Sequence, residues 1–234
     1  MVADALIYHP AVTHYNKFVA TTTGRDKALR TVQYFSRFLA WYLYRTNHSQ
    51  SSVATFSALK SNLGIVRKAM RIGKFVEHFK AAATAADAKA LDPIVRWTTV
   101  GRQLGYAFYM SFDTFSYLDA AGVKPNATMK RLAKEAYRAW MTGLLFSLVQ
   151  GVYGLYRIRG QKREIQATDA EKAVEVKKLE REQYAARVQL FSDLCDLSIP
   201  TSALGYVKLD DGLVGLLGTV SSLLGVYSQW AKTA

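Results

Sequence analysis

Apolar residues recur along most of the chain at intervals of three and four, the spacing of a helix, and we find no run that alternates like a strand. The first clear example follows Gly24-Arg25-Asp26-Lys27 and continues to about Arg45. It places one set of side chains on a shared face: Ala28, Val32, Phe35, Leu39 and Tyr42. A Ser-rich stretch at 47–55 predicts a loop. We expect a second helix from there to about Ala90.

Start and stop signals place the remaining elements. Asp92-Pro93 is a typical helix start, because Asp92 can cap the first turn and Pro93 suits the first helical position. We expect breaks in the helical pattern at 120–127 and at Ser198-Ile199-Pro200-Thr201. Helices are therefore predicted over about 93–119, 128–156, 168–194 and 212–230. The chain is predicted to be all-α.

The clearest amphipathic pattern covers residues 65–80, IVRKAMRIGKFVEHFK. As a helix, this segment has an apolar stripe made of Ile65, Ala69, Ile72, Val76 and Phe79. The basic residues lie on the other side: Arg67, Lys68, Arg71, Lys74 and His78. Five Lys/Arg and one Glu give a local charge of +4. Such a helix is typical of an anionic membrane interface, with acyl chains under the apolar stripe and headgroups on the basic residues.

The same pattern has a second interpretation, in which the apolar stripe packs on the protein's own core and the basic face is solvated. Gly73 in the middle of the segment lowers helix stability by about 1 kcal/mol relative to Ala. We therefore expect membrane binding to depend on lipid charge, salt and curvature.

Two further segments carry no charge over a length that suits a bilayer. Ala139–Tyr156 has eighteen such residues and Gly212–Trp230 has nineteen, within the range of about 17–25 that a spanning helix needs. The second segment carries a ridge of small residues, of the kind that lets membrane helices approach closely: Gly212, Gly215, Gly218, Ser222 and Gly225. Alternatively, each segment is a buried helix of a soluble bundle. Twenty Lys/Arg in residues 1–138 against ten in 157–209 favour a cytosolic N-terminal half.

Composition and charge agree with a membrane-associated helical protein that has amphipathic helices and one or two candidate embedded helices. The net charge of +13 over 234 residues calls for a polyanionic partner. Nucleic acid would satisfy that charge, but no recognised binding motif accompanies the basic helix and the uncharged segments would have no purpose. Cys195 excludes an internal disulfide because it is the single cysteine, and its Leu neighbours predict a buried structural thiol.

No constellation of catalytic residues emerges. Gly73-Lys74 lacks the Ser/Thr of a phosphate-binding loop, and the His residues at 9, 14, 48 and 78 are scattered. We therefore expect no enzyme activity, no metal site and no cofactor.

Three blocks resemble the peroxisomal membrane-elongation and proliferation peroxins, the peroxin-eleven family, in its fungal form. The first is GRDKALRTVQYFSRFLAWYL at Gly24–Leu43, with its Gln33-Tyr34 and Ser36-Arg37-Phe38 elements. The second is RKAMRIGKFVEHF at Arg67–Phe79, where Met70 stands in place of the more familiar Leu. The third is the closing stretch Asp193–Tyr227. The blocks occur in family order across nearly the whole chain.

The resemblance implies a peroxisomal membrane protein that inserts the helix at 65–80 to remodel and elongate the membrane before peroxisome fission. It also implies self-association and work with a dynamin-type fission GTPase and its adaptors. A channel or pore component for small metabolites is the alternative function. From its sequence pattern the chain is predicted to divide into four parts: an amphipathic helical region 1–134, a candidate embedded helix 135–157, a charged helix 158–196 and a Gly-rich apolar candidate membrane helix 197–234.

Overall fold

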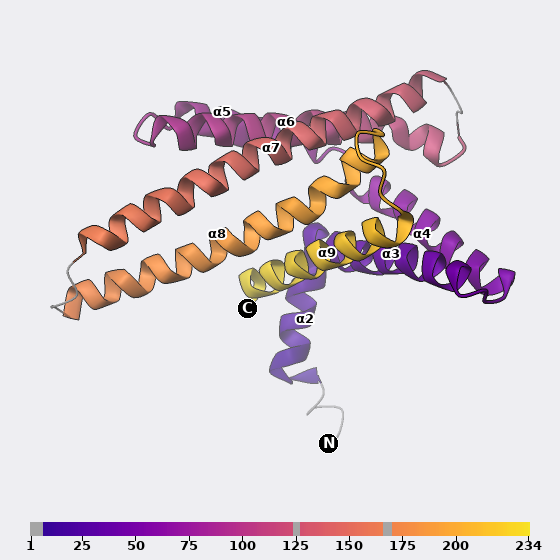
Figure 1. Ribbon diagram of the computed structural model, residues 1–234, viewed down its shortest axis with the longest axis horizontal. Coiled ribbons are helices and arrows are strands. Elements are labelled where there is room, and N and C mark those ends of the chain that lie inside the picture. The colour runs from indigo at the N-terminus through magenta and orange to yellow at the C-terminus, as the bar shows by residue number, and fades with distance from the viewer. Residues whose placement is uncertain (1–6, 124–126, 166–169) are drawn as a thin grey trace. The chain divides into compact units, whose positions relative to one another are not determined.

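The computed structural model describes residues 7–123, 127–165 and 170–234. Across these ranges the regular structure is α-helical and contains no strand, which confirms the all-α prediction (Figure 1). The helices are α2 (Pro10–Ala20), α3 (Thr22–Arg45), α4 (Gln50–Met70), α5 (Phe75–Asp87), α6 (Pro93–Ala120), α7 (Ala127–Glu164), α8 (Ala170–Ala203) and α9 (Asp211–Thr233).

Local capping explains the helix starts that the sequence predicted. The backbone N–H of Ile94 donates to Asp92 Oδ1 at 2.9 Å, so Asp92 caps α6 as expected. The predicted loop at 47–55 is too long, because Ser49 accepts from the Ser52 N–H at 3.3 Å and starts α4 one residue later. Helix α2 was not predicted.

The predicted second helix, from about residue 56 to Ala90, is wrong as a single element. Helix α4 ends at Met70 and α5 begins at Phe75. Between them Gly73 has a φ of 82°, a conformation that L-residues with a side chain seldom adopt. A left-handed residue cannot continue a right-handed helix, so the break falls at the glycine.

The predicted break at Pro200 is also wrong, because α8 continues through it to Ala203. Proline inside a helix removes one N–H donor. Near the end of α8 this loss affects one backbone bond, and Pro200 is almost fully buried. The loop that actually ends α8 follows Gly205, whose φ is 78°.

Two sequence predictions extend beyond the described residues. Positions 124–126 of the predicted break at 120–127 lie outside them. The predicted start of the charged helix at residue 168 also lies outside them.

The chain forms two compact units and passes between them more than once, first between Ile72 and Gly73. Unit 1 contains α2, α3, α4 and α9, with α3 packed against both α4 and α9. Helix α2 joins it through His14, whose Nε2 lies 2.8 Å from the Trp230 carbonyl oxygen, and through the buried Phe18 ring, 5.5 Å from that of Trp230.

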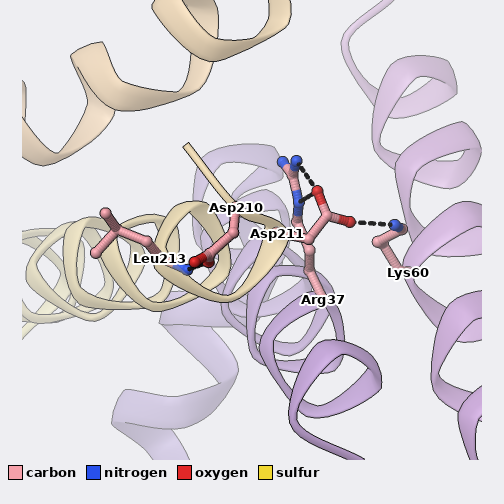
Figure 2. Close-up of polar contacts among 5 residues, drawn as sticks. All are labelled: Arg37, Lys60, Asp210, Asp211 and Leu213. Atoms are coloured by element: carbon pink, nitrogen blue, oxygen red, sulfur yellow. Dashed lines mark hydrogen bonds and ion pairs between the residues drawn. The ribbon is translucent and has the colours of Figure 1, made fainter. Parts of the chain in front are cut away.

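One acidic residue connects three helices of unit 1. Asp211, at the start of α9, accepts from the Arg37 guanidinium of α3 at 2.5 Å and from Lys60 Nζ of α4 at 3.2 Å (Figure 2). The preceding Asp210 caps α9 by accepting from the Leu213 N–H at 2.7 Å (Figure 2). These contacts fix where α9 begins along α3 and α4.

Unit 2 contains α5, most of α6, α7 and α8. Helices α6 and α7 approach closely where an added Cβ on Gly105 would lie 2.6 Å from Gly143 Cα. Helices α7 and α8 lie side by side in antiparallel orientation (Figure 1), and buried Ser147 of α7 donates to Asp193 of α8 at 2.5 Å.

Candidate membrane interface

The basic side of segment 65–80 is largely engaged with the protein itself. Arg67 is 6% exposed and forms an ion pair with Asp26 of α3, with Nε 2.9 Å from Oδ1. Its Nη1 donates to Gln33 Oε1 at 2.6 Å. Arg67 was predicted to bind headgroups, but here it holds α4 against α3.

Electrostatics favour this clamp of Arg67, Asp26 and Gln33. Burial alone would raise the pKa of Asp26, but the guanidinium groups of Arg67 and Arg71 outweigh it and hold that pKa below its ordinary value. Asp26 is therefore a carboxylate at neutral pH, and its negative charge compensates the positive charge of Arg67. Removing one partner would leave the other buried and uncompensated.

The other predicted headgroup residues divide between buried and half-buried positions. Arg71 is buried, while Lys68 and Lys74 are half-buried. In unit 2, His78 Nδ1 lies 2.8 Å from Gln103 Oε1, and its ring stacks on Tyr106 with centroids 5.5 Å apart. Arg67 in unit 1 and His78 in unit 2 are thus each engaged in contacts within their own unit.

The apolar stripe of the same segment is the part that faces outward. Ile72 is 52%, Val76 59% and Phe79 38% exposed, whereas Ile65 and Ala69 are half-buried. Phe79 also meets the Phe108 ring edge-on at 5.6 Å. This pattern is the reverse of a soluble helix, in which apolar side chains are covered and cations are exposed.

The small-residue ridge of α9 packs on α3 within unit 1. A Cβ added to Gly212, Gly215 or Gly218 would lie within 2.3–2.6 Å of an α3 atom, in Trp41, Phe38 and Tyr34 respectively. Gly225 meets the Lys27 side chain in the same way, and Ser222 is fully buried. The ridge is therefore a helix-packing surface inside the chain. Four large side chains of α9 are exposed, namely Leu213, Leu216, Leu223 and Tyr227, whereas Val214 is buried.

Helix α7, which contains the uncharged segment Ala139–Tyr156, also exposes large apolar side chains. Its buried residues include Gly143, Leu144 and Ser147. Its exposed ones include Leu145, Phe146, Val149, Val152 and Tyr156. Its buried positions are thus small or polar at Gly143 and Ser147 and large at Trp140 and Leu144. Close approach of helix backbones at small residues is typical of packing in lipid.

One helix of the described residues, α9, is long and apolar enough by composition to cross a bilayer, with a mean hydropathy of 1.2 and 39% of that window buried. Helix α7 is not in the same way long and apolar enough by composition, so the embedding of Ala139–Tyr156 in a membrane stays a prediction. Length and composition alone do not distinguish a spanning helix from a core helix, and the exposed Leu side chains of α9 are the additional evidence.

Sequence reasoning missed two features of this interface. The first is the close contact of α6 with α7, which the four-residue spacing of Gly101 and Gly105 could have signalled. The second is the clamp, which joins positions 26, 33 and 67 from separate helices, and no local pattern shows such a pairing. Within the described residues, no group of His, Cys, Asp and Glu could hold a metal ion.

Comparisons with known proteins agree with a membrane role. The sequence profile of the family described as peroxisomal biogenesis factor 11 matches residues 12–230. Peroxisomal membrane protein PMP27 of Saccharomyces cerevisiae is 32% identical over 244 residues, which cover 100% of both chains. PMP30B of Candida boidinii is 28% identical, covering 100% of this chain and 99% of its own.

More distant relatives extend the match. Peroxisomal biogenesis factor 11 of Schizosaccharomyces pombe is 23% identical over 95% of this chain and 96% of its own. No solved structure matches the chain. The relatives carry the names of membrane and biogenesis proteins and not of enzymes. This chain belongs to the peroxisomal biogenesis factor 11 family, in its fungal form, and it is a peroxisomal membrane protein involved in peroxisome proliferation.

Proposed function

We propose that this protein elongates the peroxisomal membrane by inserting the apolar side of segment 65–80 into the cytosolic leaflet. The observation that supports this best is the outward position of Ile72, Val76 and Phe79, each at least 38% exposed. Side chains inserted into one leaflet displace acyl chains there and expand that leaflet relative to the other. The membrane then bends toward the protein.

The energy of one insertion is small. Complete burial of an aliphatic or aromatic side chain contributes about 1.5–3 kcal/mol. Scaled by the exposed fractions of 52%, 59% and 38% for Ile72, Val76 and Phe79, the three side chains together contribute roughly 2–4.5 kcal/mol. Each Lys near anionic lipid adds about 1 kcal/mol. A single copy therefore binds weakly, and many copies are needed to hold a tubule.

The break at Gly73 and the clamp at Arg67 shape the mechanism. In the described conformation the two parts of the segment are separate helices, and Arg67 is paired with Asp26. Insertion as one helix requires Gly73 to take a helical φ. It also requires Arg67 to exchange the Asp26 carboxylate for a lipid phosphate. We propose that the described conformation is the docked state, and that anionic lipid favours the continuous helix.

Self-association and a dynamin-type fission GTPase with its adaptors are part of this proposal. Family resemblance supports both. Self-association would concentrate insertions along a tubule, which the small energy of one insertion requires.

The experiment combines full-length protein with anionic and with neutral vesicles, and records vesicle shape and dye release together. We expect tubules on anionic lipid without leakage. Ile72→Asp should abolish them, because a carboxylate would enter the acyl layer. Val174→Asp is the matched control, since Val174 of α8 is 69% exposed but lies in a charged stretch. Tubules that survive Ile72→Asp would contradict the insertion mechanism. Size-selective leakage without a change of shape would instead support the channel function.

A further inference from the structure

A groove between α7 and α8 lies within unit 2 and is lined by no residue of segment 65–80. It has a volume of about 300 Å³ and is lined by Leu155, Tyr156, Arg159, Gln183 and Arg187. Its lining therefore combines apolar and aromatic side chains with two guanidinium groups, one from each helix. Such a lining suits an amphiphilic anion better than a wholly apolar or wholly ionic ligand.

Along α7 the exposed surface changes character at this groove. A stripe at three- and four-residue spacing is apolar up to the groove and is made of Leu145, Val149, Val152 and Tyr156, between 47% and 74% exposed. The next positions on the same stripe are the exposed Arg159 and Arg163. An abrupt change from apolar to basic, with a Tyr at the border, is typical of a helix that leaves the acyl layer for the headgroups.

Helix α8 changes at the same level. Contacts between the antiparallel helices set the alignment, because Gly151 packs on Leu190 and Lys162 Nζ donates to Gln183 at 2.9 Å. Arg187 therefore lies opposite the α7 border. On one side of Arg187 helix α8 exposes Phe191 and Leu194, at 55% and 52%. On the other side its exposed residues are mostly charged, with Tyr184 and Val174 also exposed, at 64% and 69%.

The start of α6 lies at this level too. The Tyr153 hydroxyl of α7 donates to Asp92 Oδ2 at 2.9 Å, and Asp92 is the N-cap of α6. The first turns of α6 then expose Ile94 and Trp97, at 46% and 57%. Helices α7 and α8 thus change from exposed apolar to mostly charged surface at the level of the groove, and the start of α6 contacts α7 near that level.

The two arginines of the groove have no ion-pair partner among the described residues. The nearby Glu180 is paired with Lys162, whose Nζ lies 3.8 Å from Glu180 Oε1. Both arginines are exposed, so they are accessible to a ligand. A guanidinium group binds phosphate oxygens through two parallel N–H donors.

We propose that this groove binds the phosphate of an anionic glycerophospholipid. Arg159 and Arg187 bind the headgroup phosphate, and Tyr156 and Leu155 contact the glycerol region. One acyl chain lies along the exposed apolar stripe of α7. The proposal shares with the function proposed above only the need for an anionic bilayer, and it uses different residues. Its role is to fix the depth and orientation of unit 2 in the leaflet.

The test is native mass spectrometry of the full-length protein in detergent, titrated with phosphatidylinositol, with phosphatidylcholine and with inorganic phosphate. We expect retention of phosphatidylinositol over phosphatidylcholine. The double variant Arg159→Gln/Arg187→Gln should weaken it roughly 25- to 30-fold, since each cation near anionic lipid is worth about fivefold. Arg131→Gln/Arg181→Gln removes the same charge from exposed positions of the same two helices and should have little effect. Arg159→Lys/Arg187→Lys should recover part of the retention.

Three results would overturn the proposal: unchanged retention in the groove variant, an equal loss in the control variant, or competition by millimolar inorganic phosphate, which would indicate a site for soluble anions. The far-UV circular dichroism of each variant checks that the helices remain. The Ile72→Asp variant separates the two proposals, because it should lose tubulation while it retains phosphatidylinositol in detergent.

Discussion

Replacing Gly73 with Ala tests whether segment 65–80 straightens when it inserts. In the described state Gly73 has a φ of 82° and an added Cβ would meet no atom within 4 Å, so the substitution acts through the backbone alone. A left-handed φ costs an L-residue with a side chain about 1–2 kcal/mol. In a continuous helix Ala is better than Gly by about 1 kcal/mol.

Together these terms shift the equilibrium toward the continuous helix by about 2–3 kcal/mol, or roughly 30- to 150-fold. If that helix is the inserting form, Gly73→Ala should raise the affinity for anionic vesicles by up to this factor. The assay is vesicle co-flotation over a range of lipid concentrations. The thermal unfolding midpoint of the lipid-free protein should fall at the same time, because the turn is strained.

A matched control is available at Gly205. Its φ is 78° and an added Cβ there also meets nothing within 4 Å, but it ends α8 and lies outside the inserting segment. Gly205→Ala should lower the unfolding midpoint to a similar extent and leave vesicle affinity unchanged. Equal or weaker vesicle binding by Gly73→Ala would refute the straightening step and assign insertion to the bent form.

Further predictions concern helix packing in unit 1 and helix stability in unit 2, and each is measured by thermal unfolding of helicity in detergent. Asp26→Asn should destabilise by about 3 kcal/mol, because it leaves the Arg67 charge buried without its partner. Since the Asp26 pKa is lowered by folding, the clamp contributes fully above the ordinary carboxyl pKa of about 4 and is lost as pH falls through the lower folded value; this acid step should be missing in Asp26→Asn. Gly215→Leu should separate α9 from α3, because even its Cβ would lie 2.6 Å from the immobile Phe38 backbone N. Gly154→Ala, with nothing within 4 Å, should be neutral or stabilising by up to about 1 kcal/mol.

Helix existence could be predicted from the sequence, because its signals are local. Asp92 and Pro93 define the start of α6 through the first turn alone, and the bounds of α3 follow from its apolar spacing. The break at Gly73 could not be predicted in this way. A glycine permits either a helical or a left-handed φ, and contacts of the flanking residues decide between them.

It was harder to predict from the sequence which face of each helix is buried and which is exposed. In α3 the apolar stripe, which includes Val32 and Phe35, is 46–48% exposed at these two positions, whereas Tyr34 and Ser36 are buried. Sequence periodicity identifies an apolar face but not its surroundings. A face that meets lipid and a face that meets a protein core have the same composition, so the small-residue ridge of α9 was the better guide to packing.

The central claim, that the exposed apolar side of segment 65–80 enters the acyl layer, is tested most directly by a polarity-sensitive fluorophore on a single cysteine. Cys195 is buried and free, so Cys195→Ala gives the background for Val76→Cys and, as its neighbour on the polar side, Glu77→Cys. On anionic vesicles that contain nitroxide-labelled acyl chains, we predict a blue shift and quenching at position 76 and little change at position 77. Equal and unshifted emission at both positions would contradict the claim.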